Sequence, residues 1–229
     1  MPPRVYGRLA AASLVVVAAL SACAPNSDTG PSRIADIEAT PGAFHGTVLE
    51  PPPGRPGLIL VDTDGQEFSL TDRPADEVTV VFFGYTHCPD VCPTTMADLA
   101  VAHRQLPTEV REQVSVVFVT EDPERDTPEA LRRWLDQFDS TFVGLLGGNE
   151  ATQTALTDLL LTESTVVPEP DVPVVHPDTG DGPHDHGDYS IEHTTIIYAF
   201  GPSEAAVIYT GGFSPRQYAE DFARLAAAA

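Results

Sequence analysis

Two continuous apolar runs constrain the fold of this chain more than any other feature. Residues 78–84 read V-T-V-V-F-F-G and residues 114–120 read V-S-V-V-F-V-T. A run that is apolar throughout, instead of alternating with polar residues, indicates a strand buried on both faces. Between the two runs, residues 93–106 place apolar side chains at helical spacing. The pattern predicts a β-α-β unit at the centre of an α/β domain.

The flanking segments extend this unit in both directions. We expect strands at residues 46–50, 58–62, 67–70, 142–146, 193–200 and 205–210, and helices at residues 128–138, 149–161 and 215–228. Residues 168–188 are crowded with Pro, Gly, Asp and His, which predicts a long exposed loop. The order βαβα followed by ββα, behind a short N-terminal β extension, predicts a thioredoxin-like α/β fold over residues 42–229.

The N-terminus has the pattern of an export signal. Arg4 and Arg8 precede an apolar run at residues 9–20 that is short for a membrane span. The sequence L-S-A-C at residues 20–23 resembles a bacterial lipoprotein cleavage box, although an ordinary secretory signal would share most of these features. We therefore expect a signal peptide at residues 1–22, a lipid on Cys23 and a flexible tether at residues 23–41. This places the domain at the outer face of the bacterial cell membrane.

Composition excludes several functions. The 229 residues carry a formal charge of -22, and all 12 basic residues are arginine. Without lysine there is no Schiff-base chemistry, and an acidic chain without a basic stripe is a poor partner for nucleic acid. The tether and the acidic surface are compatible with a monomer.

Lipidation of Cys23 would leave one cysteine pair, Cys88 and Cys92. The pair lies where a buried strand ends and a helix begins, a position that stabilises a thiolate and at which open α/β sheets place ligands. On one helical face, residues four apart have Cβ atoms about 5–6 Å apart, whereas a disulfide needs about 3.5–4.5 Å. The spacing favours a soft-metal site over a dedicated redox pair.

A metal between two thiolates requires a further ligand, and His193 is the candidate. We expect it at the start of a strand that runs beside the strand carrying the cysteine loop. Two thiolates and an imidazole suit copper, while zinc could use the same set but would usually take a fourth ligand. A lone strand histidine is otherwise most often a structural residue.

Other polar residues surround these three candidates. Asp90 lies inside the cysteine loop and could tune thiolate charge or hold the turn. Asp122 and Asp126 could orient a ligand or the partner surface, but we expect them to cap the turn before the helix that begins after Thr127. The auxiliary histidines, which the predicted loop contains, are either a low-affinity copper catch or solvated residues, and composition favours the second. They are His176, His184 and His186.

Three ordered motifs resemble one known family. Residues 83–93, F-G-Y-T-H-C-P-D-V-C-P, are similar to the signature of the Sco/SenC family of copper-binding proteins. Residues 122–128 and 189–194 resemble its second and third motifs. The resemblance implies a thioredoxin-like fold, copper ligation that includes the histidine ending the third motif, and delivery of copper to the dinuclear copper centre of cytochrome c oxidase. At Glu192 the family more often has aspartate, and we expect the retained charge to preserve a supporting role.

Two other functions use the same thiolates. A thiol-disulfide oxidoreductase could reduce the cysteines of the oxidase subunit or of another cuproprotein, and a peroxide-reducing relative is the third alternative. A pure oxidoreductase does not need His193, and a peroxidatic cysteine typically works from a differently spaced site. The four-residue spacing and His193 therefore favour a metallochaperone, which we expect the lipid to hold at the membrane. The resemblance implies that its partner is the copper-centre subunit of the oxidase.

Overall fold

The computed structural model describes residues 44–57, 59–168, 189–202 and 205–228. The predicted signal peptide, Cys23 and the whole of the predicted tether lie outside these ranges, as do the three auxiliary histidines. Within the described ranges, none of the helices combines the length and apolar character that a membrane span requires.

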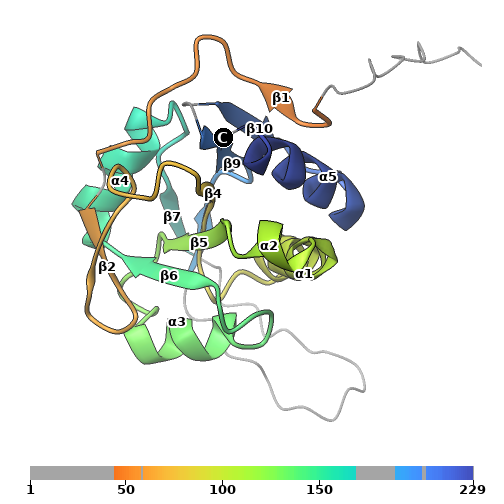
Figure 1. Ribbon diagram of the computed structural model, residues 1–229. Helices are drawn as coiled ribbons and strands as arrows, with labels where there is room; N and C mark the ends of the chain where they lie inside the picture. Colours follow the sequence, from red (N-terminus) through yellow and green to blue (C-terminus); the bar gives the residue numbers. More distant parts are fainter. Residues whose placement is uncertain (1–43, 58, 169–188, 203–204, 229) are drawn as a thin grey trace, which may run out of the picture. The chain divides into compact units, whose positions relative to one another are not determined.

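The core is an eight-stranded sheet with the strand order β1-β10-β9-β4-β5-β6-β2-β3 (Figure 1). The strands of this sheet are β1 (Thr47–Val48), β2 (Ile59–Asp62), β3 (Glu67–Ser69), β4 (Val78–Gly84), β5 (Val114–Thr120), β6 (Val143–Leu146), β9 (Ile197–Phe200) and β10 (Ala206–Tyr209). Strands β4, β5 and β6 are parallel, and the other pairs are antiparallel. The β1, β2 and β3 strands form the predicted N-terminal extension.

Strands β4 and β5 have the bounds that their apolar runs predict. They pair in parallel from Val78 beside Val114 to Gly84 beside Thr120. Val80 and Phe82 pack into the core on one face of the sheet, while Val81 and Phe83 pack into the core on the other. Because both faces are covered, these strands carry no polar alternation.

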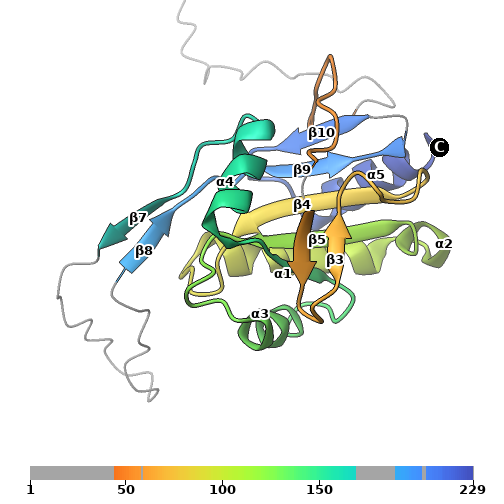
Figure 2. The ribbon, with the colours of Figure 1, turned by 90° about the vertical axis from the view of Figure 1, so that its left-hand side faces the viewer.

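Helices cover both faces of the sheet, as Figures 1 and 2 show. The helices are α1 (Val91–Gln105), α2 (Thr108–Arg111), α3 (Pro128–Leu135), α4 (Gly148–Asp158) and α5 (Pro215–Ala226). Apolar residues of α1, α3 and α5 enter one core, and those of α4 enter the other. The hydroxyl of Thr127 accepts a hydrogen bond from the amide of Ala130, which confirms the predicted cap of α3.

The segment around His193 differs from the prediction. His193 does not begin a strand: β8 (Tyr189–Glu192) ends before it, and β9 begins four residues later at Ile197. Strand β8 pairs with β7 (Thr165–Pro168) in a separate two-stranded sheet. The hydroxyl of Thr194 accepts a hydrogen bond from the amide of Ile196, a local bond that competes with strand pairing. His193 therefore sits in the connection between two sheets.

Candidate metal centre

The two cysteines lie on either side of the start of α1. Cys92 is in the first turn of the helix, whereas Cys88 precedes the helix. The amide of Cys92 lies 3.5 Å from Sγ of Cys88 and donates to it. The sulfur thus occupies the place of a helix-capping side chain, where the positive end of the helix stabilises negative charge. The four-residue spacing would place both cysteines on one helical face only if the loop were helical, and Cys88 lies before the helix begins at Val91.

Gly84, the last residue of β4, makes room for Cys92. A Cβ at this position would lie 2.6 Å from Sγ of Cys92 and 3.2 Å from the ring of Phe118. Any side chain here would displace the sulfur. The absence of a side chain at the end of the strand therefore allows the fully buried Cys92 to approach the sheet.

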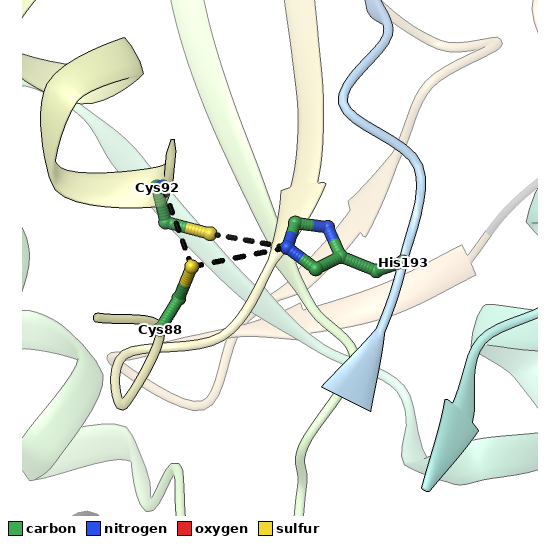
Figure 3. Close-up of side chains that lie close together, drawn as sticks. All are labelled: Cys88, Cys92 and His193. Atoms are coloured by element: carbon green, nitrogen blue, oxygen red, sulfur yellow. Dashed lines mark hydrogen bonds between the residues drawn. The ribbon is translucent and has the colours of Figure 1, made fainter. Parts of the chain in front are cut away.

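His193 completes a cluster of three metal-ligating atoms, two sulfurs and one imidazole nitrogen (Figure 3). Its Nε2 lies 3.6 Å from Sγ of Cys92 and 3.9 Å from Sγ of Cys88. All three ligand atoms lie within 4.8 Å of one another. The two cysteines are not joined in a disulfide, and the imidazole is only 5% exposed. Residues from two distant parts of the sequence thus converge on one buried point.

The other side of the imidazole is held by acceptors. Nδ1 lies 2.8 Å from the carbonyl oxygen of Thr194, to which it donates, and 3.2 Å from Oε2 of Glu121. The ring of Tyr85 contacts the imidazole edge to face, with centroids 5.5 Å apart. With the proton on Nδ1, the lone pair of Nε2 faces the two sulfurs. This is the tautomer that a metal ligand needs.

The three groups shift one another's pKa values. The contact with Cys92, followed by that with His193, lowers the pKa of Cys88 to about 3 in spite of burial. The same contact and burial raise the pKa of Cys92. Burial acts to lower the pKa of His193, but Cys88 and Glu121 outweigh it and raise the pKa to about 9. Without a metal, the site therefore holds a Cys88 thiolate, a Cys92 thiol and an imidazolium at neutral pH.

Asp126 holds the cysteine loop in place. Its carboxylate accepts hydrogen bonds from the amide and hydroxyl of Thr86 and from the hydroxyl of Thr120. The expectation that Asp126 caps the turn before α3 was wrong, because its side chain is fully buried and turned toward the loop. His87 approaches the same carboxylate at 3.7 Å, but the three stronger donors already satisfy Asp126.

A second set of contacts ties β8 to the loop after β5. The hydroxyl of Tyr189 donates to Oδ1 of Asp122 at 2.7 Å. Arg125 pairs with the same carboxylate and donates to the carbonyl oxygen of Tyr189 at 2.9 Å. The guanidinium also lies over the Tyr189 ring, 3.7 Å from its centroid. We call these three residues, Asp122, Arg125 and Tyr189, the latch; its Tyr189 lies four residues before His193. The expectation that Asp122 caps the turn before α3 was wrong, because its carboxylate is engaged by Tyr189 and Arg125.

The other predicted residues lie nearby without a side-chain contact to the cluster. Asp90 is exposed, and its side chain makes no capping bond to α1, although its backbone amide helps to lower the pKa of Cys88. Glu192 is exposed on β8 and lines a cavity of about 200 Å³ together with His193. The carboxylate that reaches the imidazole belongs to Glu121, which the sequence analysis did not single out.

The distances suit a metal with three ligands. Thiolate sulfur and imidazole nitrogen lie about 2.3 Å and about 2.0 Å from a bound zinc ion, so at about 120° they would lie about 3.7 Å apart. At about 109°, the tetrahedral angle, the separation would be about 3.5 Å. The observed 3.6 Å and 3.9 Å are close to both values, so the three atoms are spaced to bind one metal ion. Two sulfurs and an imidazole in this arrangement can hold a soft metal, and the same two sulfurs can exchange disulfides.

Fold and site together define a thioredoxin-like α/β protein with a dithiol-imidazole centre at the carboxyl end of a central strand. A family model described as SCO1/SenC matches residues 56–227. The match spans β2 to α5, so the chain belongs to the SCO1/SenC family.

Individual relatives agree with this assignment. A protein of Stutzerimonas stutzeri whose name refers to copper binding is 37% identical over 147 residues, 64% of each chain. ScoI of Bradyrhizobium japonicum, solved with copper bound, is 28% identical with a TM-score of 0.56, covering 80% of this chain and 99% of that one. The chain spans about half to two thirds of the length of the curated relatives it matches.

A more distant structure supports the fold alone. BsSco is described as a member of the Sco family of cytochrome c oxidase assembly proteins in which a disulfide switch was identified. It is 18% identical, with a TM-score of 0.54, and covers 76% of this chain and 94% of that one. The predicted thioredoxin-like fold is confirmed by these structural matches.

Proposed function

We propose that this chain is a copper chaperone that binds one copper ion through Cys88, Cys92 and His193. The observation that carries the proposal is the convergence of two sulfurs and Nε2 within 4.8 Å at a buried point. Soft thiolates and an imidazole are ligands that copper prefers, and no fourth protein ligand is needed for a three-coordinate ion. Copper bound to the Bradyrhizobium relative supports the choice of metal.

The recipient belongs to the same proposal. We propose delivery to the dinuclear copper centre of cytochrome c oxidase, consistent with the description of BsSco as an oxidase assembly protein. The N-terminal sequence supports export, lipidation of Cys23 and a position at the outer face of the bacterial membrane. The tether at residues 23–41 would let the domain at residues 42–229 reach a membrane-bound partner.

A thiol-disulfide oxidoreductase is the second candidate, and the lowered pKa of Cys88 favours it. The Cys88 thiolate would attack one sulfur of a partner disulfide and release the other as a thiolate. Cys92, after losing its proton, would then attack the mixed disulfide. The partner leaves with two thiols, and Cys88 and Cys92 are left as a disulfide. The partner is thus reduced by two electrons that this chain supplies.

A His193→Ala variant separates the two candidates. Because the imidazole is one of three ligands but forms no bond in the exchange, we expect the variant to lose tight copper binding and to keep reduction of a model disulfide. The exchange should need a higher pH than in the wild type, since His193 helps to lower the pKa of Cys88. Copper is measured by competition with a chelator, and exchange by release of a chromogenic thiol. Stoichiometric, wild-type-affinity copper in the variant would contradict the chaperone proposal.

A further inference from the structure

Glu121 is a buried carboxylate that the fold itself does not explain. It lies directly after β5, and its side chain is fully buried. No hydrogen bond of standard geometry reaches either carboxylate oxygen from the residues that the structure describes. Burial raises the pKa of Glu121, while the nearby His193 imidazole and Ser164 hydroxyl act to lower it. Removing a carboxylate from water without donors is costly, so a residue of this kind needs a compensating partner.

The partner is His193. Oε2 of Glu121 lies 3.2 Å from Nδ1 of the imidazole, on the side of the ring that faces away from the sulfurs. The carbonyl oxygen of Thr194 accepts the Nδ1 proton at 2.8 Å, so Glu121 acts on the ring mainly through its charge. The neighbouring Asp122 has its own cation in Arg125, which leaves the imidazole as the one cationic side chain in ion-pair distance of Glu121 among the described residues.

The charges around the imidazole are unbalanced. Two cysteine sulfurs lie on its Nε2 side and one carboxylate on its Nδ1 side, all of them buried. When a metal replaces the thiol proton, two thiolates and a carboxylate share one buried volume. Three negative charges are better compensated by a divalent ion than by a monovalent one, because charges interact strongly in a poorly solvated interior.

We propose that Glu121 is a positioning residue for His193 that also sets which metal charge the centre favours. It keeps Nε2 toward the sulfurs and stabilises divalent over monovalent ions, hence Cu(II) over Cu(I). The inference rests on the proposed function, in that it names the same three residues as the metal ligands. It goes beyond that function by assigning the charge preference of the centre to one carboxylate outside the ligand set.

The test is a Glu121→Gln variant, which keeps the size of the side chain and removes its charge. The affinities for Cd(II) and Ag(I), two soft ions that do not change oxidation state, are measured by competition under reducing conditions. We expect the Cd(II):Ag(I) affinity ratio to fall at least about tenfold, with folding checked by thermal unfolding. Glu163→Gln is the matched control, because Glu163 is exposed and lines the same cavity as His193. The Cd(II):Ag(I) affinity ratio of this variant should stay within about twofold of the wild-type ratio.

Copper gives a second measurement. For a one-electron couple, a tenfold fall in the ratio of the Cu(II) affinity to the Cu(I) affinity raises the reduction potential of the bound copper by about 59 mV. Glu121→Asp keeps the charge and should restore most of the wild-type ratio and potential. An unchanged ratio in Glu121→Gln, or an equal fall in Glu163→Gln, would overturn the inference. Absence of copper binding to the wild-type protein would instead refute the proposed function, while the Cd(II) and Ag(I) measurements would still decide the role of Glu121.

Discussion

The latch formed by Asp122, Arg125 and Tyr189 makes a quantitative prediction about how His193 is positioned. A Tyr189→Phe variant removes the hydroxyl that donates to Asp122 at 2.7 Å and leaves the ring under Arg125 in place. A hydrogen bond to a charged group contributes about 1.5–3 kcal/mol. Asp122 keeps its pairing with Arg125, so we expect the lower part of this range, a loss of about 1.5–2 kcal/mol of unfolding free energy.

The same change should weaken metal binding. Loosening β8 increases the freedom that His193 loses when it binds a metal, and about 1.4 kcal/mol corresponds to a tenfold change in affinity. We therefore expect the copper Kd to rise about three- to tenfold, with the stoichiometry unchanged. Denaturant unfolding gives the stability, and competition with a chelator gives the affinity.

Tyr198→Phe is the matched control for this prediction. The hydroxyl of Tyr198 donates to the carbonyl oxygen of Leu159 at 2.6 Å, in the core on the α4 side of the sheet. Its loss should cost at least as much stability, because a buried carbonyl is left without a donor. Copper affinity should not change. If Tyr189→Phe loses stability but binds copper as tightly as Tyr198→Phe does, the latch does not position His193 and the reasoning is refuted.

Three further predictions concern the cysteine loop and the N-terminal strand. Gly84→Ala should cost about 1–3 kcal/mol of stability and weaken copper binding by displacing Cys92, whereas Gly144→Ala, which crowds α3 leucines, should cost stability alone. Because the pKa of Cys88 is lowered to about 3, its alkylation by iodoacetamide should stay fast from neutral pH to about pH 5. The stability that the thiolate contributes should be fully present above about pH 8.5, decline progressively as the pH falls, and be lost completely below about pH 3. Alkylation that slows below about pH 8 would contradict the thiolate assignment. Asp221→Ala removes the acceptor of the Gly46 amide, so hydrogen exchange at Gly46 should quicken while copper affinity stays constant; unchanged exchange would show that the contact does not hold β1.

The sequence predicted the centre of the sheet because the signal there is local. A strand covered on both faces must be apolar throughout, and the apolar runs that became β4 and β5 have the same bounds in the structure. The hydroxyl and proline at the start of α3 likewise predicted its cap. Patterns confined to a few neighbouring residues could be recognised without knowledge of the fold.

The position of His193 was harder to predict because it depends on distant contacts. The apolar residues after His193 have the pattern of a strand that would begin at this histidine. In the structure, the preceding residues up to Glu192 pair with β7 instead, and a local sequence pattern does not reveal that pairing. No sequence pattern distinguished Glu121 from the other acidic residues either. It stands beside Asp122 in a chain with 34 acidic residues, and only the folded chain shows that its side chain is buried against the imidazole.

X-ray absorption spectroscopy of the copper-loaded protein tests the central claim most directly. We predict one copper per chain, with two sulfur neighbours and one imidazole nitrogen, and loss of the sulfur signal in a variant with Cys88 and Cys92 both changed to serine. A copper ion surrounded only by oxygen and nitrogen, or one retained at full occupancy by the double variant, would contradict the account.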